Sequence, residues 1–403
     1  MKDYKKHKEN FLEYAILSFA FFPLIPNAIK GLPVVLLLIA GLVNFSFKKP
    51  KIKLFIIFSF LYILYLLSLS HTTNWQYAFK KLETALSMLI IPLVFFVLLP
   101  DFKPNEKLKI KFIKLFVLST SLFSIISILA IWFNKSIPYY KDFYSNKFRT
   151  VVNDLPLIGQ HPIYASFFLA VSILFTVYLY YHFKKKYLFF SFLLNLTLLL
   201  MLSSKGIMLS LIIIILIFLL FVIKIDRKIK LFSLFFIGIG IMSLFLLNRR
   251  MHEMLLPETY KQINKNYSNS YRVAINSCSI NLIKKQWLFG YGMGDVQQKL
   301  DECYTQKNIT IKKNAYNSHN QYFDAWLRAG VAGFIYLILF ISYLFYTSLK
   351  RKNYLLLALV LLYSINFLFE NILLRQSGVI LFYFLIIFFF LDNNLYTKLN
   401  YKK

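Results

Sequence analysis

Apolar residues fall in long blocks along this chain, with short polar stretches between them. The blocks are about 17 to 25 residues long, which is the length that a helix needs to cross a hydrocarbon core of roughly 30 Å. They predict an all-α integral membrane protein. Its twelve transmembrane helices are expected near residues 11–29, 31–47, 54–70, 82–99, 112–133, 162–181, 187–203, 206–223, 231–247, 321–347, 354–369 and 376–391.

Two of the polar stretches are too long to be simple turns. The longer one, residues 248–320, separates the ninth and tenth predicted helices, and residues 134–161 separate the fifth and sixth. The chain is therefore expected to divide into residues 1–247 with nine helices, the loop region 248–320, and residues 321–403 with three helices and a tail.

Composition agrees with a membrane protein and excludes other classes. Hydrophobic residues make up 58% of the chain and charged residues 16%, whereas roughly a quarter of a soluble domain is charged. A soluble Rossmann enzyme, a β-barrel and a disordered tail protein are therefore excluded. The first apolar block follows a basic stretch without a small-residue cleavage site, so we expect it to be retained as a helix.

The net charge of +30 comes from short clusters of Lys and Arg that lie between the apolar blocks. A nucleic-acid-binding protein would gather such charges on one face, so we expect no nucleic-acid partner. Cytoplasmic loops of membrane proteins carry the excess of Lys and Arg. This rule places both termini in the cytoplasm, and both long loops on the periplasmic side of a bacterial inner membrane, with membrane lipids around the helices.

The two cysteines, Cys278 and Cys303, both fall in the longer loop. An oxidising periplasm would permit a disulfide between them. Free thiols remain the alternative, because the sequence does not show whether the two Cβ atoms face each other. Cysteines and carboxylates form no cluster with the spacing of metal ligands, so we expect neither a metal nor another cofactor.

The most informative segment runs from Asn314 into the tenth predicted helix. It contains His319 and Asn320, then nine further residues, then Gly330 and Gly333. An imidazole titrates near neutral pH, so at the membrane surface it can take a proton from an attacking hydroxyl. Glycines three positions apart would let another helix approach closely. A single interfacial His can also simply bond a loop carbonyl, so its neighbours decide between the two roles.

This pattern resembles the O-antigen ligase family, in which His is followed by Asn, Ser or Gln, nine residues, Gly, two residues and Gly. Upstream, Arg272 and the GYGMG run from Gly290 to Gly294 resemble the outer-loop segment of that family. The resemblance implies a GT-C-like membrane glycosyltransferase. Such an enzyme moves a glycan from undecaprenyl diphosphate to a sugar hydroxyl of lipid A core or another acceptor at the periplasmic face. The transfer is metal-independent and inverts the anomeric centre.

Three residues are expected to carry the chemistry. His319 would be the base, and Arg272 and Lys205 would hold the diphosphate. The family usually has Arg where this chain has Lys205, and Lys keeps the charge but loses the two-pronged geometry for phosphate oxygens. The alternatives are that Lys205 is an interfacial anchor and that Arg272 pairs with a loop carboxylate such as Asp295.

Further residues are candidates for binding substrate. The long loop is net positive and offers aromatic side chains on which sugar rings can stack, namely Tyr260, Tyr267, Tyr271, Trp287 and Tyr291. The predicted substrate-binding set is Asn320, Gln321, His161, Arg375 and Tyr271.

For several charged residues a structural role is also expected. His161 would mainly shape the shorter loop. Glu370 and Arg375 would form an ion pair within the protein, although Arg375 could add to a phosphate site. Asp324 and Arg328, four residues apart on one helix, are expected to pair.

Two other functions remain open from the sequence. An O-antigen polymerase would join lipid-linked repeat units and tends to use two sizeable outer loops, whereas the 134–161 loop is modest, which favours a ligase. A non-enzymatic lipid-glycan flippase would need ionisable residues and broken helices near the bilayer midplane. The polar residues named above cluster at the predicted outer interface instead.

Overall fold

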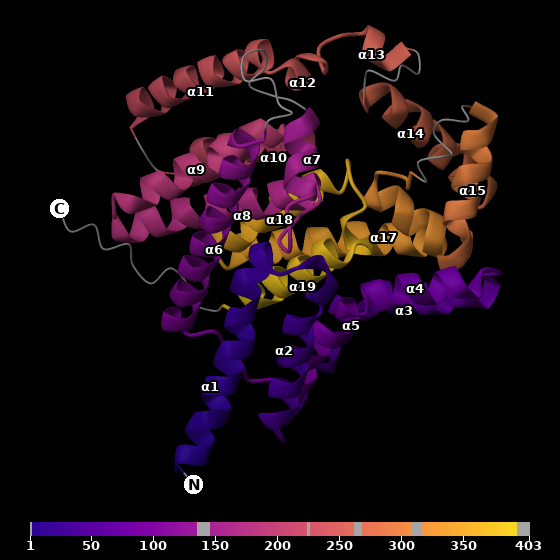
Figure 1. Ribbon diagram of the computed structural model, residues 1–403. Helices are drawn as coiled ribbons and strands as arrows, with labels where there is room; N and C mark the ends of the chain where they lie inside the picture. Colours follow the sequence, from indigo (N-terminus) through magenta and orange to yellow (C-terminus); the bar gives the residue numbers. More distant parts are fainter. Residues whose placement is uncertain (1, 135–145, 224–225, 262–267, 308–315, 393–403) are drawn as a thin grey trace. The chain divides into compact units, whose positions relative to one another are not determined.

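The computed structural model describes residues 2–134, 146–223, 226–261, 268–307 and 316–392, and within these ranges every regular element is a helix (Figure 1). Tyr267 and Asn314 lie outside the described residues. The expected all-α class is therefore confirmed, and each of the twelve predicted ranges overlaps at least one helix.

Seven of the described helical segments are long and apolar enough to cross a membrane. They are Ile52–His71, Trp75–Leu98, Glu106–Trp132, Pro162–Phe183, Lys205–Val222, Arg227–Leu247 and Gln321–Lys350. Four shorter apolar segments accompany them, at Asn27–Val43, Tyr187–Leu202, Tyr354–Asn366 and Gln376–Phe390. The chain is a multi-pass membrane protein by these criteria.

The helices group into two compact units, one formed by Met1–Ser119 with Ile275–Lys403 and the other by Thr120–Ala274. Helices α6 (Glu106–Trp132) and α14 (Ser268–Lys285) run from one unit into the other. Unit 1 otherwise contains α1 (Lys2–Ser18), η1 (Phe19–Leu24), η2 (Asn27–Ile29), α2 (Leu32–Val43), α3 (Ile52–Leu67), η3 (Ser68–His71), α4 (Trp75–Ala85), α5 (Ser87–Pro92), η4 (Leu93–Leu98), α15 (Gly292–Lys307), α17 (Gln321–Lys350), α18 (Tyr354–Asn366), η6 (Ile372–Leu374) and α19 (Gln376–Phe390).

Unit 2 contains α7 (Asn146–Asn153), α8 (Pro162–Phe183), α9 (Tyr187–Leu202), α10 (Lys205–Ile217), η5 (Phe218–Val222), α11 (Arg227–Leu247), α12 (Arg249–His252) and α13 (Glu258–Lys261). Helices α8 and α9 form a hairpin. Asn195 of α9 donates to Ser172 of α8 at 3.0 Å and accepts from Ser124 of α6 at 2.7 Å. Such polar contacts help apolar helices associate in a membrane, because the surrounding lipid is as apolar as their side chains.

Helix α19 forms the centre of unit 1. It is apolar on every side and its residues from Ser377 to Phe390 are buried, as expected for a helix without a polar face. Phe384 stacks on Phe19 of η1 with 3.8 Å between the ring centroids, and α5 and α18 pack beside it. The segment that enters α19, residues 367–375, is therefore anchored by a buried helix, and this segment carries Glu370.

Candidate functional site

His319 and Glu370 form a hydrogen-bonded pair in unit 1. His319 directly precedes the N-terminus of α17, and Glu370 lies between α18 and η6. The His319 Nδ1 atom is 3.0 Å from Glu370 Oε2, and the two side chains are 21% and 14% exposed. The prediction that Glu370 pairs with Arg375 is wrong. The Glu370 carboxylate faces His319, and the exposed Arg375 forms no ion pair with the described residues.

This contact determines which ring nitrogen can accept a proton. An ionised carboxylate only accepts hydrogen bonds, so His319 Nδ1 carries the hydrogen. In the neutral imidazole the lone pair is then on Nε2. Among the described residues, Nε2 has no hydrogen-bond partner. The His319 imidazole can therefore act as a base through Nε2, while the Glu370 carboxylate holds Nδ1.

The backbone around His319 is held in an unusual conformation. His319 has a φ of +46°, in the left-handed region that is costly for a residue with a β-carbon. Its backbone N–H donates to Asn317 Oδ1 at 3.0 Å. On the other side, Asn320 caps α17, because its Oδ1 accepts from the backbone amides of Tyr322 and Phe323 at 3.0 and 3.1 Å. These contacts fix the direction in which the imidazole leaves the chain.

Gln321 joins the start of α17 to the segment that carries Glu370. Its backbone N–H donates to the Phe367 carbonyl and its Oε1 accepts from the Leu373 amide, both at 2.7 Å. The side-chain oxygens of Asn320 and Gln321 are thus used within the protein. Their predicted contact with substrate stays a prediction.

The expected Asp324–Arg328 ion pair is confirmed. Arg328 Nε is 2.9 Å from Asp324 Oδ2, and both side chains are buried. Arg328 Nη1 also donates to the Met293 carbonyl at 2.6 Å. A buried charge pair is strongly destabilised when one partner is lost, because the remaining charge cannot reach water. The pair therefore fixes α17 against the first turn of α15.

Helix α17 is kinked where the glycine motif lies. Ala329 and Gly330 leave the helical conformation, and Gly330 has a φ of +63°, which favours glycine. A β-carbon at Gly330 would collide with the Leu288 carbonyl oxygen. Close approach at this glycine was expected from a second helix, but it is made by the loop that follows α14.

That loop is hydrogen-bonded into the kink. The Val331 amide donates to the Trp287 carbonyl at 3.0 Å, and the Tyr291 amide donates to the Leu327 carbonyl at 2.7 Å. A β-carbon on Gly290 would come within 2.6 Å of the Leu327 oxygen. The GYGMG run and the His-to-Gly motif, which are distant in the sequence, therefore form one packed backbone contact.

The long loop is also fastened at two other points. Cys278 of α14 and Cys303 of α15 form a disulfide with 5.9 Å between their Cα atoms, so the alternative of free thiols is excluded. Asp295 accepts hydrogen bonds from the backbone amides of Thr73 and Asn74 at 2.7 and 2.8 Å. Burial opposes ionisation of Asp295, but these bonds outweigh it and the pKa of the carboxyl lies below its usual value. Asp295 thus anchors α15 beside the start of α4.

In unit 2, Lys205 begins α10 and is part of a cluster of charges. Its Nζ is 3.0 Å from Glu253 Oε2, and the two side chains are 12% and 16% exposed. The positive charges of Arg250 and Arg272 also act on the Lys205 ammonium. Lys205 and Arg272, the two predicted diphosphate ligands, therefore share one electrostatic environment, together with Arg250 and with a carboxylate that neutralises part of the charge.

A further arginine reaches the turn before Lys205. Arg149 Nη1 donates to the Leu202 carbonyl at 2.7 Å and to Ser204 Oγ at 3.4 Å. Ser204 in turn shares a hydrogen bond of 2.6 Å with Ser166 of α8. These contacts hold the end of α9 and the start of α10 in place.

The remaining predicted residues lie at helix starts and on α14. His161 is exposed at the N-cap of α8, and its carbonyl accepts from the Tyr164 and Ala165 amides. This agrees with a role in shaping the end of the shorter loop. Tyr271 is half-buried next to Arg272 on α14, and Arg375 is exposed at the start of α19.

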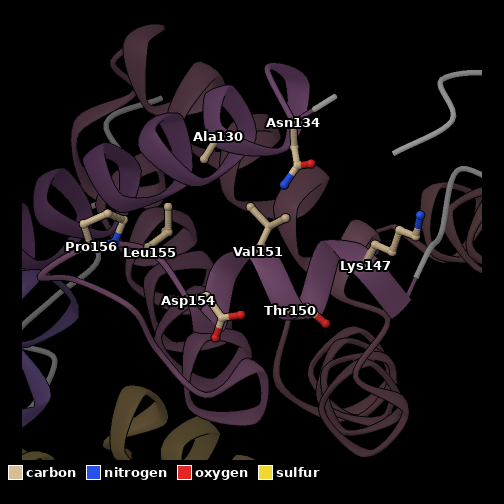
Figure 2. Close-up of a pocket in the computed structure, with 8 residues that line it drawn as sticks. All are labelled: Ala130, Asn134, Lys147, Thr150, Val151, Asp154, Leu155 and Pro156. Atoms are coloured by element: carbon tan, nitrogen blue, oxygen red, sulfur yellow. The ribbon is translucent and has the colours of Figure 1, made fainter. Parts of the chain in front are cut away.

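The shorter loop carries a groove of about 390 Å³ (Figure 2). Ala130 of α6 and Asn134 just beyond that helix line one wall. Thr150 and Val151 of α7, with Asp154 just after it, line the other. The Asp154 carboxylate and the Lys147 ammonium give the groove charges of both signs. It therefore has the character of a mixed polar and apolar surface.

Comparison with known families gives the decisive observation. The profile of the family described as O-antigen ligase matches residues 190–338. The chain carries an O-antigen ligase domain. The resemblance inferred from the His-to-Gly spacing is thereby confirmed for residues 190–338, and the match supports a membrane glycosyltransferase of the ligase and polymerase type. Among curated proteins, none matches the chain.

The matched O-antigen ligase segment contains most of the predicted machinery. It begins in α9 and ends in α17, so it includes Lys205, Arg272, the GYGMG run and His319. Glu370, the partner of the His319 imidazole, lies beyond it.

Sequence reasoning missed several residues that contact the candidate residues of each unit. Glu370 was recognised as a charged residue in a turn but assigned the wrong partner. Two groups that act on Lys205, Arg250 and Glu253, were not singled out, and neither was Arg149, which bonds the turn before Lys205. Their only signal was charge inside predicted outer loops, and many other residues of those loops share it.

Proposed function

We propose that this protein transfers a glycan from undecaprenyl diphosphate to a sugar hydroxyl of lipid A core at the periplasmic face of a bacterial inner membrane. The observation that carries the proposal is the His319–Glu370 pair at the start of the helix that bears the family motif. A glycosyl diphosphate already contains a good leaving group, so the enzyme needs a base for the acceptor and positive charge for the diphosphate.

In the proposed reaction, His319 Nε2 takes the proton of the acceptor hydroxyl. The hydroxyl oxygen attacks the anomeric carbon from the side opposite the diphosphate, and the bond between that carbon and the diphosphate oxygen breaks. The anomeric centre is inverted. The proton ends on the imidazole, and Glu370 stabilises the resulting positive charge because its carboxylate is 3.0 Å from Nδ1.

Lys205 and Arg272 are proposed to hold the diphosphate as negative charge develops on it. Guanidinium and ammonium groups form short charge-assisted hydrogen bonds to phosphate oxygens. Glu253 forms an ion pair with Lys205, and an incoming diphosphate would compete with that carboxylate. Tyr271, Asn320, Gln321, His161 and Arg375 are the further candidates for substrate contact.

The direct test is a transfer assay with purified protein, an undecaprenyl-diphosphate oligosaccharide and lipid A core. His319→Ala is expected to lower the turnover rate by about 10²-fold to 10⁴-fold, the range that a positioned base contributes. His71→Ala, at an exposed histidine of unit 1, is the matched control and should turn over like the wild type. Wild-type turnover by His319→Ala would exclude the proposed base.

The same assay separates the related activities. A ligase gives one joined glycolipid, whereas a polymerase acting on two lipid-linked repeats gives a ladder of products. Analysis of the new linkage tests inversion, and turnover unchanged by a chelator is expected for a metal-independent reaction. Movement of the lipid-linked glycan across vesicles without a new covalent product would favour a flippase.

A further inference from the structure

His319 and Glu370 are 51 residues apart in the chain, so their geometry depends on what joins the two segments. Ser318, the residue before His319, is hydrogen-bonded to Asn371, the residue after Glu370. Ser318 Oγ lies 3.1 Å from Asn371 Oδ1 and 3.0 Å from Asn371 Nδ2, and both side chains are buried. A hydrogen bond between Ser318 and Asn371 thus joins the two segments that carry His319 and Glu370.

A third residue fixes the orientation of the Asn371 amide. Asn371 Nδ2 donates to Asp324 Oδ1 at 2.9 Å. Because an ionised carboxylate cannot donate, the amide nitrogen must face Asp324, and the amide oxygen is then available to accept the Ser318 hydroxyl hydrogen. The orientation of Asn371 is therefore determined by charge as well as by shape.

Asp324 is itself held by the buried ion pair. Its Oδ2 receives Arg328 Nε at 2.9 Å, and Arg328 also binds the Met293 carbonyl at 2.6 Å. Both side chains are almost wholly inaccessible, at 0% and 1% exposed. A connected and satisfied polar network in a low-dielectric interior is rigid, because breaking any member leaves another unpaired.

We propose that Asn371, together with Ser318, is a positioning residue that couples the buried Asp324–Arg328 pair to the His319–Glu370 pair. The inference rests on the proposed function, since it assigns these residues the role of keeping the His319 base oriented toward Glu370. Among the described residues, none of the four side chains of the network, those of Ser318, Asn371, Asp324 and Arg328, is hydrogen-bonded to the His319 imidazole. Loosening the network should therefore lower the rate of proton transfer and leave substrate binding largely unchanged.

The experiment compares Asn371→Ala with Asn353→Ala in the transfer assay, with kcat and both KM values and the thermal stability of the detergent-solubilised protein measured for each. Asn353 is the matched control because it caps the other end of α18 and donates to the Phe389 carbonyl at 2.8 Å. Asn371→Ala is expected to lower kcat by about tenfold to a hundredfold with KM values within about twofold. Asn353→Ala should lower the stability and leave kcat near that of the wild type.

A second pair of variants tests the same network should Asn371→Ala fail to fold. Ser318→Ala removes the hydroxyl and should lower kcat, whereas Ser318→Thr keeps it and should restore most of the rate. A kcat for Asn371→Ala equal to the wild-type value overturns the proposal, as does equal loss in Ser318→Ala and Ser318→Thr. If the wild type itself forms no glycolipid, the proposed function fails. If the wild type is active and only the variants behave differently from the prediction, the proposed function stands and the positioning role fails.

Discussion

Replacement of Glu370 by Gln tests the central pair without changing its size. The introduced glutamine side chain could still occupy the position near His319 Nδ1, but it is uncharged and its amide nitrogen can donate to the ring. Donation to Nδ1 would place the hydrogen on Nε2, the atom that must accept the proton of the acceptor. We therefore expect Glu370→Gln to lower kcat while the donor and acceptor KM values change little.

The size of the effect follows from the contact. A hydrogen bond to a charged group contributes roughly 1.5–3 kcal/mol, which corresponds to about a tenfold to hundredfold change in rate when the charge forms only in the transition state. The 3.0 Å contact and the small exposure of both side chains favour the upper part of this range. Loss of the correct tautomer adds to this loss of rate, since the equivalent change in the serine protease triad lowers kcat by roughly 10⁴-fold. We expect a loss of about 10² to 10⁴.

The assay is single-turnover transfer of a labelled oligosaccharide from undecaprenyl diphosphate to lipid A core. Glu302→Gln is the matched control, because Glu302 is an exposed carboxylate that pairs with Lys299 on the same helix. The double variant His319→Ala with Glu370→Gln should be no slower than His319→Ala alone, since residues that act as a unit are not additive. Additive losses, or a Glu370→Gln variant as fast as Glu302→Gln, would refute the reasoning.

Three other perturbations test the rest of the structure. Lys205→Gln should raise the donor KM about tenfold, from the loss of one charge-assisted bond, in titrations of the lipid-linked donor. Gly330→Ala should prevent stable folding, seen as loss of the monodisperse protein in detergent, whereas Gly238→Ala, which meets no atom within 4 Å, should not. Reduction of the Cys278–Cys303 disulfide should destabilise the protein by about 3.5 kcal/mol for a closed loop of this length, measured as a lower melting temperature in dithiothreitol.

The helices were largely predictable because hydrophobic block length is a local property of the sequence. Their ends were less so. The predicted span 82–99 corresponds to helical structure that begins at Trp75, with a turn at Leu86 between α4 and α5 and a change to π-helix in η4. Helix α4 has an amphipathic sequence, WQYAFKKLETA, so its polar positions hid it from a search for continuous apolar runs. The Asp324–Arg328 pair was predictable for the opposite reason, since four residues along a helix always bring two side chains to one face.

The site was only partly predictable because its contacts are between distant segments. His319 could be found from its spacing to Gly330, but nothing local indicates that Glu370 faces it across 51 residues. The charges near Glu370 suggested Arg375, which is nearer in the sequence, and this choice was wrong. The pairing is decided by how Gln321 and Asn371 join the two segments, and such tertiary hydrogen bonds leave no periodic signal.

The constant spacing of the motif has a physical explanation in unit 1. His319 is held at the start of α17 by its pairing with Glu370, and Gly330 is held further along by the Leu288 carbonyl. A helix rises about 1.5 Å and turns about 100° for each residue, so one inserted residue between these two fixed points would turn the imidazole away from its carboxylate. The eleven residue steps from His319 to Gly330 therefore match the separation between the base and the contact of Gly330 with the Leu288 carbonyl. This is why the spacing identifies the family more reliably than either residue type alone.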